Sequence, residues 1–246
     1  MDHALLKPGE RIDDLQRRGF RIIQHPDAFR FGTDTVLLAD FARPARRARV
    51  VDLCCGAGAV ALLLLARRPE IHVTGIEILP DAADRAVRNA VLNGVADRFS
   101  VIAGDIRDAH AALGHGQFTL CACNPPYFKA GAALLSSNEA ARMARHAGEL
   151  TPLDIAAAAA RLLQTGGRFA VVYPAPRALE MFRAMEDAGI APKRVRTVHG
   201  VMGKPPKHIL IDGVKGAGAG LHFMEPLYLR EMDGTPTVEC RRIYGE

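Results

Sequence analysis

Short apolar runs alternate with longer helix-like patterns along most of this chain. This alternation limits the possible folds more than any other feature of its 246 residues. Helices are expected to end near Arg68 and Asn93, and another should run from Thr151 or Asp154 to Leu163. The predicted strands are 50–53, 71–78, 99–102, 118–123 and 168–173. Strands and helices that alternate at this spacing are typical of a parallel, doubly wound sheet.

The last third of the chain departs from this pattern. A helix is expected at 176–188, and strands at 194–198 and 208–214 follow it. Because only a short connection joins these two strands, we expect an antiparallel partner at one edge of the sheet. The predicted fold class is therefore α/β, with a Rossmann-like, doubly wound, mostly parallel seven-stranded sheet and an antiparallel edge strand.

The length of the chain fits a single domain over residues 1–246. Residues 1–48 are expected to form an N-terminal extension, and residues 49–246 form the core. The extension should contain a short strand at 21–24 and a helix through Thr35–Phe41 with Thr33 or Asp34 as its N-cap.

Charge and apolar run lengths narrow the functional classes. The net charge of +5 suits a polyanionic partner such as RNA. The longest apolar runs, 59–66 and 155–160, are far too short to span a membrane, and no basic-then-apolar leader is present. We therefore expect a cytoplasmic protein without a membrane partner.

The five cysteines indicate neither a disulfide framework nor a metal site. An odd number argues against complete disulfide pairing. Cys54-Cys55 and Cys121-x-Cys123 lack the paired spacing that tetrahedral zinc needs, and both pairs lie at the ends of predicted buried strands. Cysteine in such places behaves as a small apolar residue, so no metal is expected.

A glycine turn follows the first core strand. Gly56-x-Gly58-x-x-Ala61 loosely matches a dinucleotide-binding fingerprint, in which glycines let the backbone approach a ligand closely. Glu77 lies 21 residues after Gly56, at the end of the second core strand, where a carboxylate can hold both hydroxyls of a ribose. These features fit NAD about as well as they fit S-adenosylmethionine.

Three further features favour S-adenosylmethionine. Asp52 would repel a pyrophosphate but suits the ammonium end of the sulfonium ligand. Gly104-Asp105-Ile106 follows the third strand, where a carboxylate can accept a hydrogen bond from the adenine amine. The third feature, Asn124-Pro125-Pro126-Tyr127, follows the fourth strand at the rim where doubly wound sheets bind ligands.

The tetrapeptide has the groups that methylation of an aromatic amine requires. Two consecutive prolines remove two backbone donors and leave carbonyl oxygens free. The Asn124 side-chain oxygen and the Pro125 carbonyl can each accept one hydrogen of the amine, which aims the nitrogen lone pair at a methyl group. Tyr127 offers a ring on which the target base can stack. Catalysis in this scheme comes from positioning and hydrogen bonding, with no metal.

These motifs together resemble the class I amino-methyltransferases. The block Phe31-Gly32-Thr33-Asp34-Thr35-Val36-Leu37-Leu38, with Asn124-Pro-Pro-Tyr127-Phe-Lys129 and Arg142-x-x-Arg145-His146, is more specifically similar to the bacterial tRNA1(Val) adenine-N(6)-methyltransferase family. The likeness covers about Leu15 to Tyr244. It implies methylation of the adenosine just 3′ of a tRNA anticodon, with the anticodon loop as partner.

The resemblance also assigns roles to single residues. Thr33 and Asp34 would lie near the methionine part of the cofactor, and Gly56 and Gly58 beneath it. Glu77 would hold the ribose and Asp105 the adenine, with Ile78 and Ile106 beside them. Asn124, Pro125 and Tyr127 would be catalytic. One departure is Cys54, which replaces the first glycine of the family's Asp-x-Gly-x-Gly-x-Gly loop.

An RNA substrate needs basic residues to hold its phosphates. The candidates near the pocket are Lys129, Arg142, Arg145 and His146, and those further along the chain are Lys204, Lys207, Arg241 and Arg242. The segment from Phe128 to Glu149 shows no clean period and is expected to be a loop or lid.

Other functions remain open from the sequence alone. The same tetrapeptide occurs in enzymes that methylate glutamine in release factors, although those enzymes typically carry a sizeable N-terminal helical domain. A guanine amine is another possible acceptor. An NAD-dependent oxidoreductase and an RNA-binding module without turnover are the alternatives outside methyl transfer.

Overall fold

The computed structural model describes residues 2–26, 28, 31–126 and 150–245. Its main sheet has nine strands in the order β10-β8-β9-β7-β6-β3-β4-β5, and β11 also pairs with β8. Seven of these strands have five or more residues: β3 (Arg49–Leu53), β4 (His72–Glu77), β5 (Phe99–Ala103), β6 (Phe118–Cys123), β7 (Leu163–Pro174), β8 (Ile190–His199) and β9 (Pro206–Lys215). The predicted α/β class and the seven-stranded core sheet are confirmed.

The antiparallel strand of the sheet is β9, which lies between β7 and β8. It pairs antiparallel with both β7 and β8, while β5, β4, β3, β6 and β7 all pair parallel. The predicted antiparallel pairing of the two late strands is therefore confirmed. Beyond β8 lie only two short strands, β10 (His222–Phe223) and β11 (Leu227–Tyr228).

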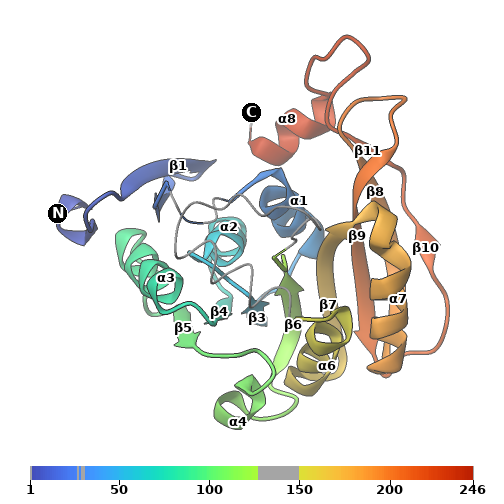
Figure 1. Ribbon diagram of the computed structural model, residues 1–246, viewed down its shortest axis with the longest axis horizontal. Coiled ribbons are helices and arrows are strands. Elements are labelled where there is room, and N and C mark those ends of the chain that lie inside the picture. Colours follow the sequence, from blue (N-terminus) through green and yellow to red (C-terminus); the bar gives the residue numbers. More distant parts are fainter. Residues whose placement is uncertain (1, 27, 29–30, 127–149, 246) are drawn as a thin grey trace.

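Helices cover both faces of the sheet, as Figure 1 shows. One face carries α1 (Thr33–Ala42), α2 (Ala59–Arg67) and α3 (Pro80–Leu92). The other carries α4 (Ala109–Leu113), α6 (Pro152–Leu162) and α7 (Ala178–Asp187). The chain ends with α8 (Val238–Tyr244), which packs against α1, and two short 3-10 turns lie at Asp2–Leu5 and Ala175–Arg177.

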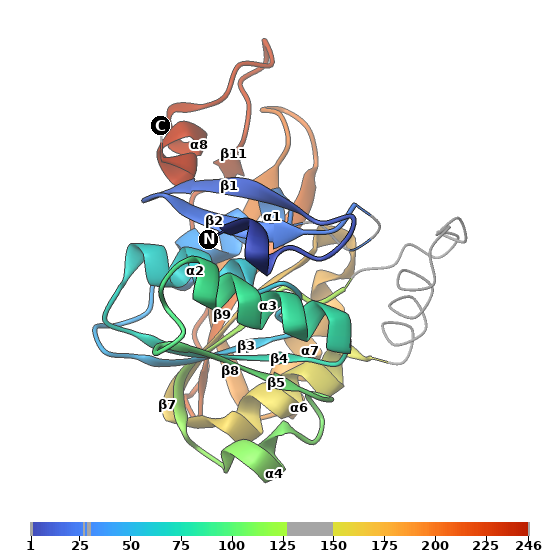
Figure 2. The same cartoon turned by 90° about the vertical axis from the view of Figure 1, so that its left-hand side faces the viewer.

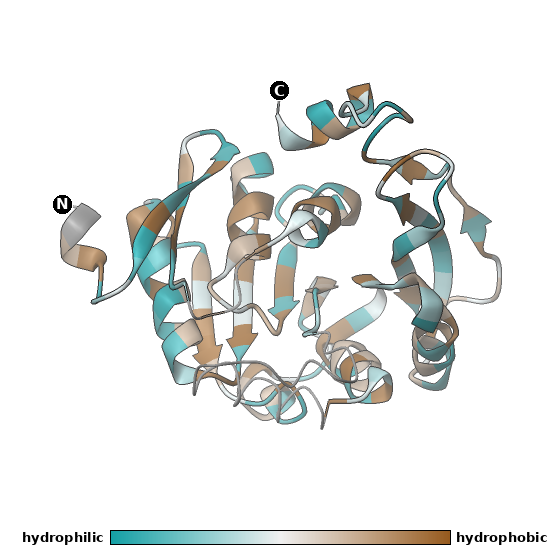
Figure 3. Cartoon of the chain, turned by 45° about the horizontal axis from the view of Figure 1, so that its top comes forward, coloured by the Kyte–Doolittle hydropathy of each residue, from teal (hydrophilic) through white to brown (hydrophobic). Residues whose placement is uncertain are grey.

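Hydropathy explains how these layers pack. All eight residues from Ala59 to Ala66 in α2 are buried, since this helix is covered on several sides. α3 buries one side only, and it carries many polar residues, so it is largely teal at the left of Figure 3, whereas the neighbouring strands are mainly brown. Among the described residues no helix has the length and apolar character needed to cross a membrane.

A hairpin from the N-terminal segment lies over α2 and α3 (Figure 2). It consists of β1 (Arg11–Arg17) and β2 (Phe20–Gln24), which pair antiparallel in a separate sheet. Asn89 of α3 accepts from the amide of Ile23 at 2.6 Å and donates to the carbonyl of Ala57 at 2.9 Å. One fully buried amide therefore joins the hairpin, helix α3 and the loop after β3.

The structure corrects three details of the sequence prediction. Helix α4 was not predicted, and β7 begins at Leu163 rather than at Arg168. Helix α1 begins at Thr33, but its N-cap is Gly32 and no side chain caps it. In contrast, the predicted start of α6 is confirmed, because Thr151 and Asp154 form a reciprocal capping box.

Candidate active site

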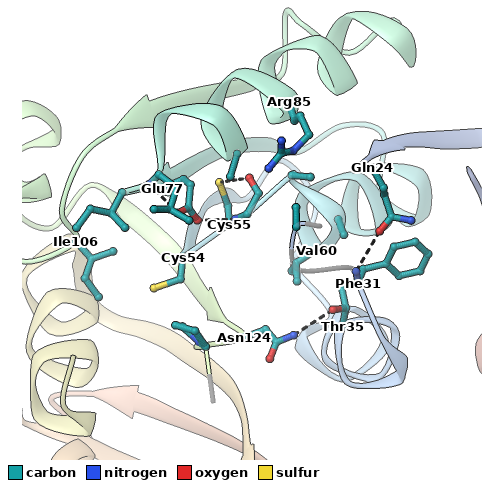
Figure 4. Close-up of a pocket in the computed structure, with 18 of the residues that line it drawn as sticks. Gln24, Phe31, Thr35, Cys54, Cys55, Val60, Glu77, Arg85, Ile106 and Asn124 are labelled. Atoms are coloured by element: carbon teal, nitrogen blue, oxygen red, sulfur yellow. Dashed lines mark hydrogen bonds between the residues drawn. The ribbon is translucent and has the colours of Figure 1, made fainter. Parts of the chain in front are cut away.

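The carboxyl ends of β6, β3, β4 and β5 lie side by side and form the floor of a pocket. Register pairs place Cys123 beside Leu53, Leu53 beside Ile76, and Glu77 beside Ala103. The residues that follow these strands line the pocket, as Figure 4 shows for Cys54, Glu77, Ile106 and Asn124. Doubly wound sheets bind ligands at this edge.

The loop between β3 and α2 has three left-handed residues in five positions. Gly56 has φ +55° and Gly58 has φ +85°, and a Cβ on Gly58 would lie 2.7 Å from the Phe99 ring. Cys54 also has a positive φ, +57°. A side chain in this region costs roughly 1–2 kcal/mol, so Cys54 occupies a position that favours glycine. The loop nonetheless has the shape that brings its backbone up to the pocket.

Glu77 is 6% exposed and fixes this loop from below. Its Oε2 accepts from the amide of Gly56 at 2.8 Å, and its Oε1 accepts from the amide of Leu79 at 2.9 Å. Burial raises the pKa of Glu77, while these amide donors and the charge of Arg85 act in the opposite direction. Each carboxylate oxygen retains a second lone pair for a ligand hydroxyl.

Asp52 is 1% exposed and lies beneath the loop rather than in the pocket lining. Its side chain shares the face of Val50, toward α2, and the backbone amide of Ala61 in the first turn of α2 acts on it. Neither carboxylate oxygen has a hydrogen-bond partner of normal geometry among the described residues. Burial, with the nearby charge of Glu77, raises the pKa of Asp52 to about 8.

Asp105 lines the pocket on the β5 side, and Ile78 and Ile106 belong to the same lining. The Asp105 carboxylate forms an ion pair with Arg107, whose guanidinium donates to Oδ2 at 2.5 Å. Arg107 also lines the pocket. The two isoleucines provide apolar walls next to this charged group. The combination suits a flat heterocycle with an exocyclic amine.

Asn124 follows β6 directly, and its amide contacts Thr35 of α1. The Asn124 Nδ2 donates to Thr35 Oγ1 at 3.0 Å, as the dashed line in Figure 4 marks. The Asn124 Oδ1 is buried and has no hydrogen-bond partner among the described residues. Both Asn124 and Pro126 line the pocket, and Pro125 between them is buried. An acceptor is thus available beside the pocket for a donor that the described part of the chain does not supply.

The pocket wall formed by α1, α3 and β2 contains residues that the sequence did not single out as site residues. Thr35 of α1, Arg85 of α3 and Gln24 of β2 all line the pocket. The predicted Thr33 and Asp34 belong to the same turn of α1 as Thr35 but are not part of the lining. Arg85, only 5% exposed, was detectable as a charge on the apolar side of a predicted helix.

The thiols near the pocket floor are neutral. Burial raises the pKa of Cys55, Cys121 and Cys123 well above its ordinary value. No disulfide joins any of the five cysteines. In the ranges that the structure describes, no group of three or more His, Cys, Asp or Glu side chains could hold a metal ion.

The predicted residues Tyr127, Lys129, Arg142, Arg145 and His146 lie outside the described residues. Most of the other predicted site residues lie around the pocket: Cys54, Gly56, Glu77, Ile78, Asp105, Ile106 and Asn124. Gly58 and Asp52 lie beneath it.

Comparison with known proteins agrees with this geometry. The family model described as methyltransferase small domain matches residues 26–188. Among solved structures, a predicted O-methyltransferase from Agrobacterium tumefaciens superposes with a TM-score of 0.71 at 23% identity, over 86% of this chain and 95% of that one. A geranyl diphosphate methyltransferase in complex with SAM superposes with a TM-score of 0.54 at 17% identity, over 74% and 84% of the two chains. These two likenesses show the fold.

Fold and pocket together define a Rossmann-like methyltransferase that uses S-adenosylmethionine, and the chain belongs to the methyltransferase small domain family. Within it, the chain is related to proteins named tRNA1(Val) (adenine(37)-N6)-methyltransferase. The one from Yersinia pseudotuberculosis serotype O:3 is 31% identical, over 88% of this chain and 84% of its own length. The one from Porphyromonas gingivalis is 34% identical, over 81% and 80%. The protein is therefore an S-adenosylmethionine-dependent N-methyltransferase of their family.

The residues present fit this cofactor. Glu77 offers free lone pairs to a diol, and Asp105 with the two isoleucines of the lining suits an adenine. Gly56 lines the pocket, and no atom lies within 4 Å of the place that a Cβ would take, so its backbone is open to a ligand. When bound, S-adenosylmethionine supplies an activated methyl group.

Proposed function

We propose that this protein methylates the N6 exocyclic amine of an adenosine in tRNA, next to the anticodon. The observation that carries the proposal is the buried, unpartnered Asn124 Oδ1 at the pocket wall, just after β6. Most buried polar groups in proteins are hydrogen-bonded, so an orphaned acceptor in a pocket points to a donor on the substrate. The names of the two relatives support a tRNA adenine as the source of that donor.

The acceptors at Asn124 and Pro125 explain how such an amine reacts. The lone pair of an aromatic amine is delocalised into its ring, which makes the nitrogen a poor nucleophile. Hydrogen bonds from the two N–H groups to Asn124 Oδ1 and the Pro125 carbonyl would hold the lone pair toward the cofactor. As positive charge develops on the nitrogen, both oxygens stabilise it, and the proton then leaves the nitrogen for solvent. Tyr127 remains the predicted stacking partner.

The cofactor would be held by the carboxyl ends of β3, β4 and β5. In this proposal Glu77 accepts from the ribose hydroxyls, Asp105 accepts from the adenine amine, and Ile78 and Ile106 pack on the ring. Gly56, Gly58 and Cys54 bring the loop backbone up to the ligand. Asp52 acts from beneath by supporting the first turn of α2, and Thr33 and Asp34 act by shaping the turn that contains Thr35.

The β8–β9 hairpin is our candidate for an RNA-binding surface within the described residues. β9 begins at Pro206 and pairs His208 with Pro174 at the end of β7, so this hairpin lies at the same edge of the sheet as Asn124. Lys204 and Lys207 are exposed there, and neither has an ion-pair partner among the described residues.

The other basic candidates are less available for contacts with RNA phosphates. Arg242 faces the carboxylates of Asp40 and Glu239, and Arg241 donates to the carbonyl of Pro236. Lys129, Arg142, Arg145 and His146 remain predicted contacts. A tRNA substrate also implies that the protein acts in the cytoplasm.

The test is transfer of labelled methyl from S-adenosylmethionine to total tRNA, followed by nucleoside analysis. We expect label in N(6)-methyladenosine. Asn124→Ala should lower kcat by about a hundredfold or more, because a preorganised acceptor is lost, while S-adenosylhomocysteine binding measured by calorimetry changes little. Label in a guanosine, or in glutamine of a protein added as acceptor, would move the proposal to that substrate. An Asn124→Ala enzyme with the wild-type rate would refute the mechanism.

A further inference from the structure

We propose that Thr35 is a positioning residue that keeps the oxygen of the Asn124 amide directed toward the substrate. This inference rests on the proposed function and deepens it. Thr35 does not itself touch the reacting atoms; it acts through Asn124, 89 positions further along the chain.

The contact joins two elements that pack firmly. Thr35 is 3% exposed in the first turn of α1, and its backbone amide is held by the Oδ1 of Asp34 at 2.8 Å. α1 packs against α2 and β6, and β6 is the strand that Asn124 follows. In Figure 4 the Thr35 hydroxyl and the Asn124 amide face each other across the pocket wall. The hydroxyl therefore has a fixed place from which to hold the amide.

A side-chain amide has a donor end and an acceptor end of nearly the same shape, so packing alone does not choose between its two orientations. The Thr35 hydroxyl can accept from Nδ2 or donate to Oδ1, so it holds the amide in place, and a donating substrate amine then favours the orientation that leaves Oδ1 in the pocket. With Nδ2 donating to Thr35 Oγ1 at 3.0 Å, Oδ1 is the end left in the pocket without a partner. The opposite orientation would present N–H donors to an amine that also donates.

The expected size of the effect follows from the strength of one such bond. A hydrogen bond between neutral groups contributes about a factor of ten to the equilibrium between the held amide and one that has turned away. If the two are otherwise equal, loss of the Thr35 hydroxyl lowers the held population from about nine tenths to about one half, so kcat should fall about twofold. Cofactor contacts on β3, β4 and β5 are unaffected, so the KM for S-adenosylmethionine should change little.

The experiment compares three variants in the methyl-transfer assay with tRNA. Thr35→Val removes the hydroxyl with little change in shape, and Thr35→Ser keeps it. Thr74→Val is the matched control. Thr74 lies in β4, its hydroxyl contacts Ser100 Oγ at 3.3 Å, and it does not line the pocket. We expect about half the wild-type kcat for Thr35→Val, and the wild-type kcat for both Thr35→Ser and Thr74→Val. A Thr35→Ser enzyme as slow as Thr35→Val, or a Thr35→Val enzyme at the wild-type rate, would overturn the proposal.

A second readout needs no substrate. In the nitrogen–proton correlation spectrum of the protein with S-adenosylhomocysteine, the side-chain amide of Asn124 is identified by its absence in Asn124→Ala. This signal should shift or broaden in Thr35→Val and stay in place in Thr35→Ser and Thr74→Val. An unmoved signal in Thr35→Val would refute the contact. A wild-type protein that methylates no tRNA would instead refute the proposed function, and the spectrum would still decide the role of Thr35.

Discussion

Asp52 is a buried acid whose ionisation works against the fold. Its two oxygens have no hydrogen-bond partner of normal geometry among the described residues, and Glu77 adds a like charge nearby. The backbone amide of Ala61 at the start of α2 favours the charged form but does not outweigh burial. Since burial disfavours the charged form, the folded protein holds this carboxyl in its protonated state near neutral pH.

This predicts a specific dependence of stability on pH. The Asp52 pKa rises from 3.8 to about 8 on folding, so between these values the folded state binds more protons than the unfolded state. The contribution of Asp52 to stability is complete below about pH 3.8 and is lost as pH rises toward 8. Wild type should therefore lose stability relative to Asp52→Asn between pH 5 and 7.5, by at most about 1.4 kcal/mol per pH unit. Urea unfolding of both proteins at pH 5 and pH 7.5 measures this difference in stability. An equal change of stability in wild type and in Asp52→Asn would contradict the prediction.

Cys54 shows why one site residue departs from the expected loop. Its φ of +57° is one that glycine adopts without cost. The resemblance identified Cys54 as the departure, but only the backbone shows that the chain keeps the glycine conformation there. The side chain gains a place in the pocket lining.

At the scale of elements, the loop from β3 to α2 depends on close packing at one glycine. Gly58→Ala would place a Cβ 2.7 Å from Phe99 at φ +85°, while Gly56→Ala, at φ +55°, meets no atom within 4 Å. We expect Gly58→Ala to lower the free energy of unfolding by about 3 kcal/mol, from strain and overpacking, and Gly56→Ala by about 1 kcal/mol, from strain alone. Urea midpoints compare the two; equal losses would show that contact with Phe99 is unimportant.

The elements that the sequence predicts are those with a local signal. The strand at 118–123 is a short apolar run, and the start of α6 follows from the chemistry of Thr151 and Asp154. The start of α1 is different, because its N-cap is Gly32 rather than a side chain that can cap. Strand β7 extends back to Leu163 through pairing with Phe118, a contact made only in the folded sheet.

The same distinction applies to the pocket. Glu77, Asp105 and Asn124 are predictable because each follows a strand, and parallel strands end at one edge. Thr35 and Arg85 line the pocket because α1 and α3 dock in a particular orientation. No spacing in the sequence encodes that orientation, so the place of Thr35 in the pocket needed the structure, and for Arg85 the sequence offered only a charge on the apolar side of a predicted helix.

For the whole molecule, the net charge of +5 matters less than where the charges lie. Lys204 and Lys207 stand on the hairpin at the edge of the sheet that carries the pocket. Arg68 follows α2 and precedes β4, at the opposite edge, and Arg183 is exposed on α7. Substitutions at Lys204 and Lys207, or at Arg68 and Arg183, can therefore change the net charge by the same amount at different places on the molecule.

We expect Lys204→Glu with Lys207→Glu to raise the KM for tRNA by about tenfold at low salt and to leave kcat nearly unchanged, because phosphate contacts are lost. Arg68→Glu with Arg183→Glu lowers the net charge by the same amount and should change the KM by less than about threefold. Steady-state kinetics at two salt concentrations measure both. The same rise in both double variants would mean that only total charge matters and that the hairpin is no docking surface.

Asn89 gives the molecule one more property. Its amide holds Ile23 in the hairpin and Ala57 in the loop after β3, so neither segment can open without breaking bonds to the same side chain. Free energy gained when a ligand settles on that loop must therefore also oppose fraying of the first two strands. Hydrogen exchange at the Ile23 amide would slow as the pocket fills, and the hairpin would report occupancy from outside the pocket.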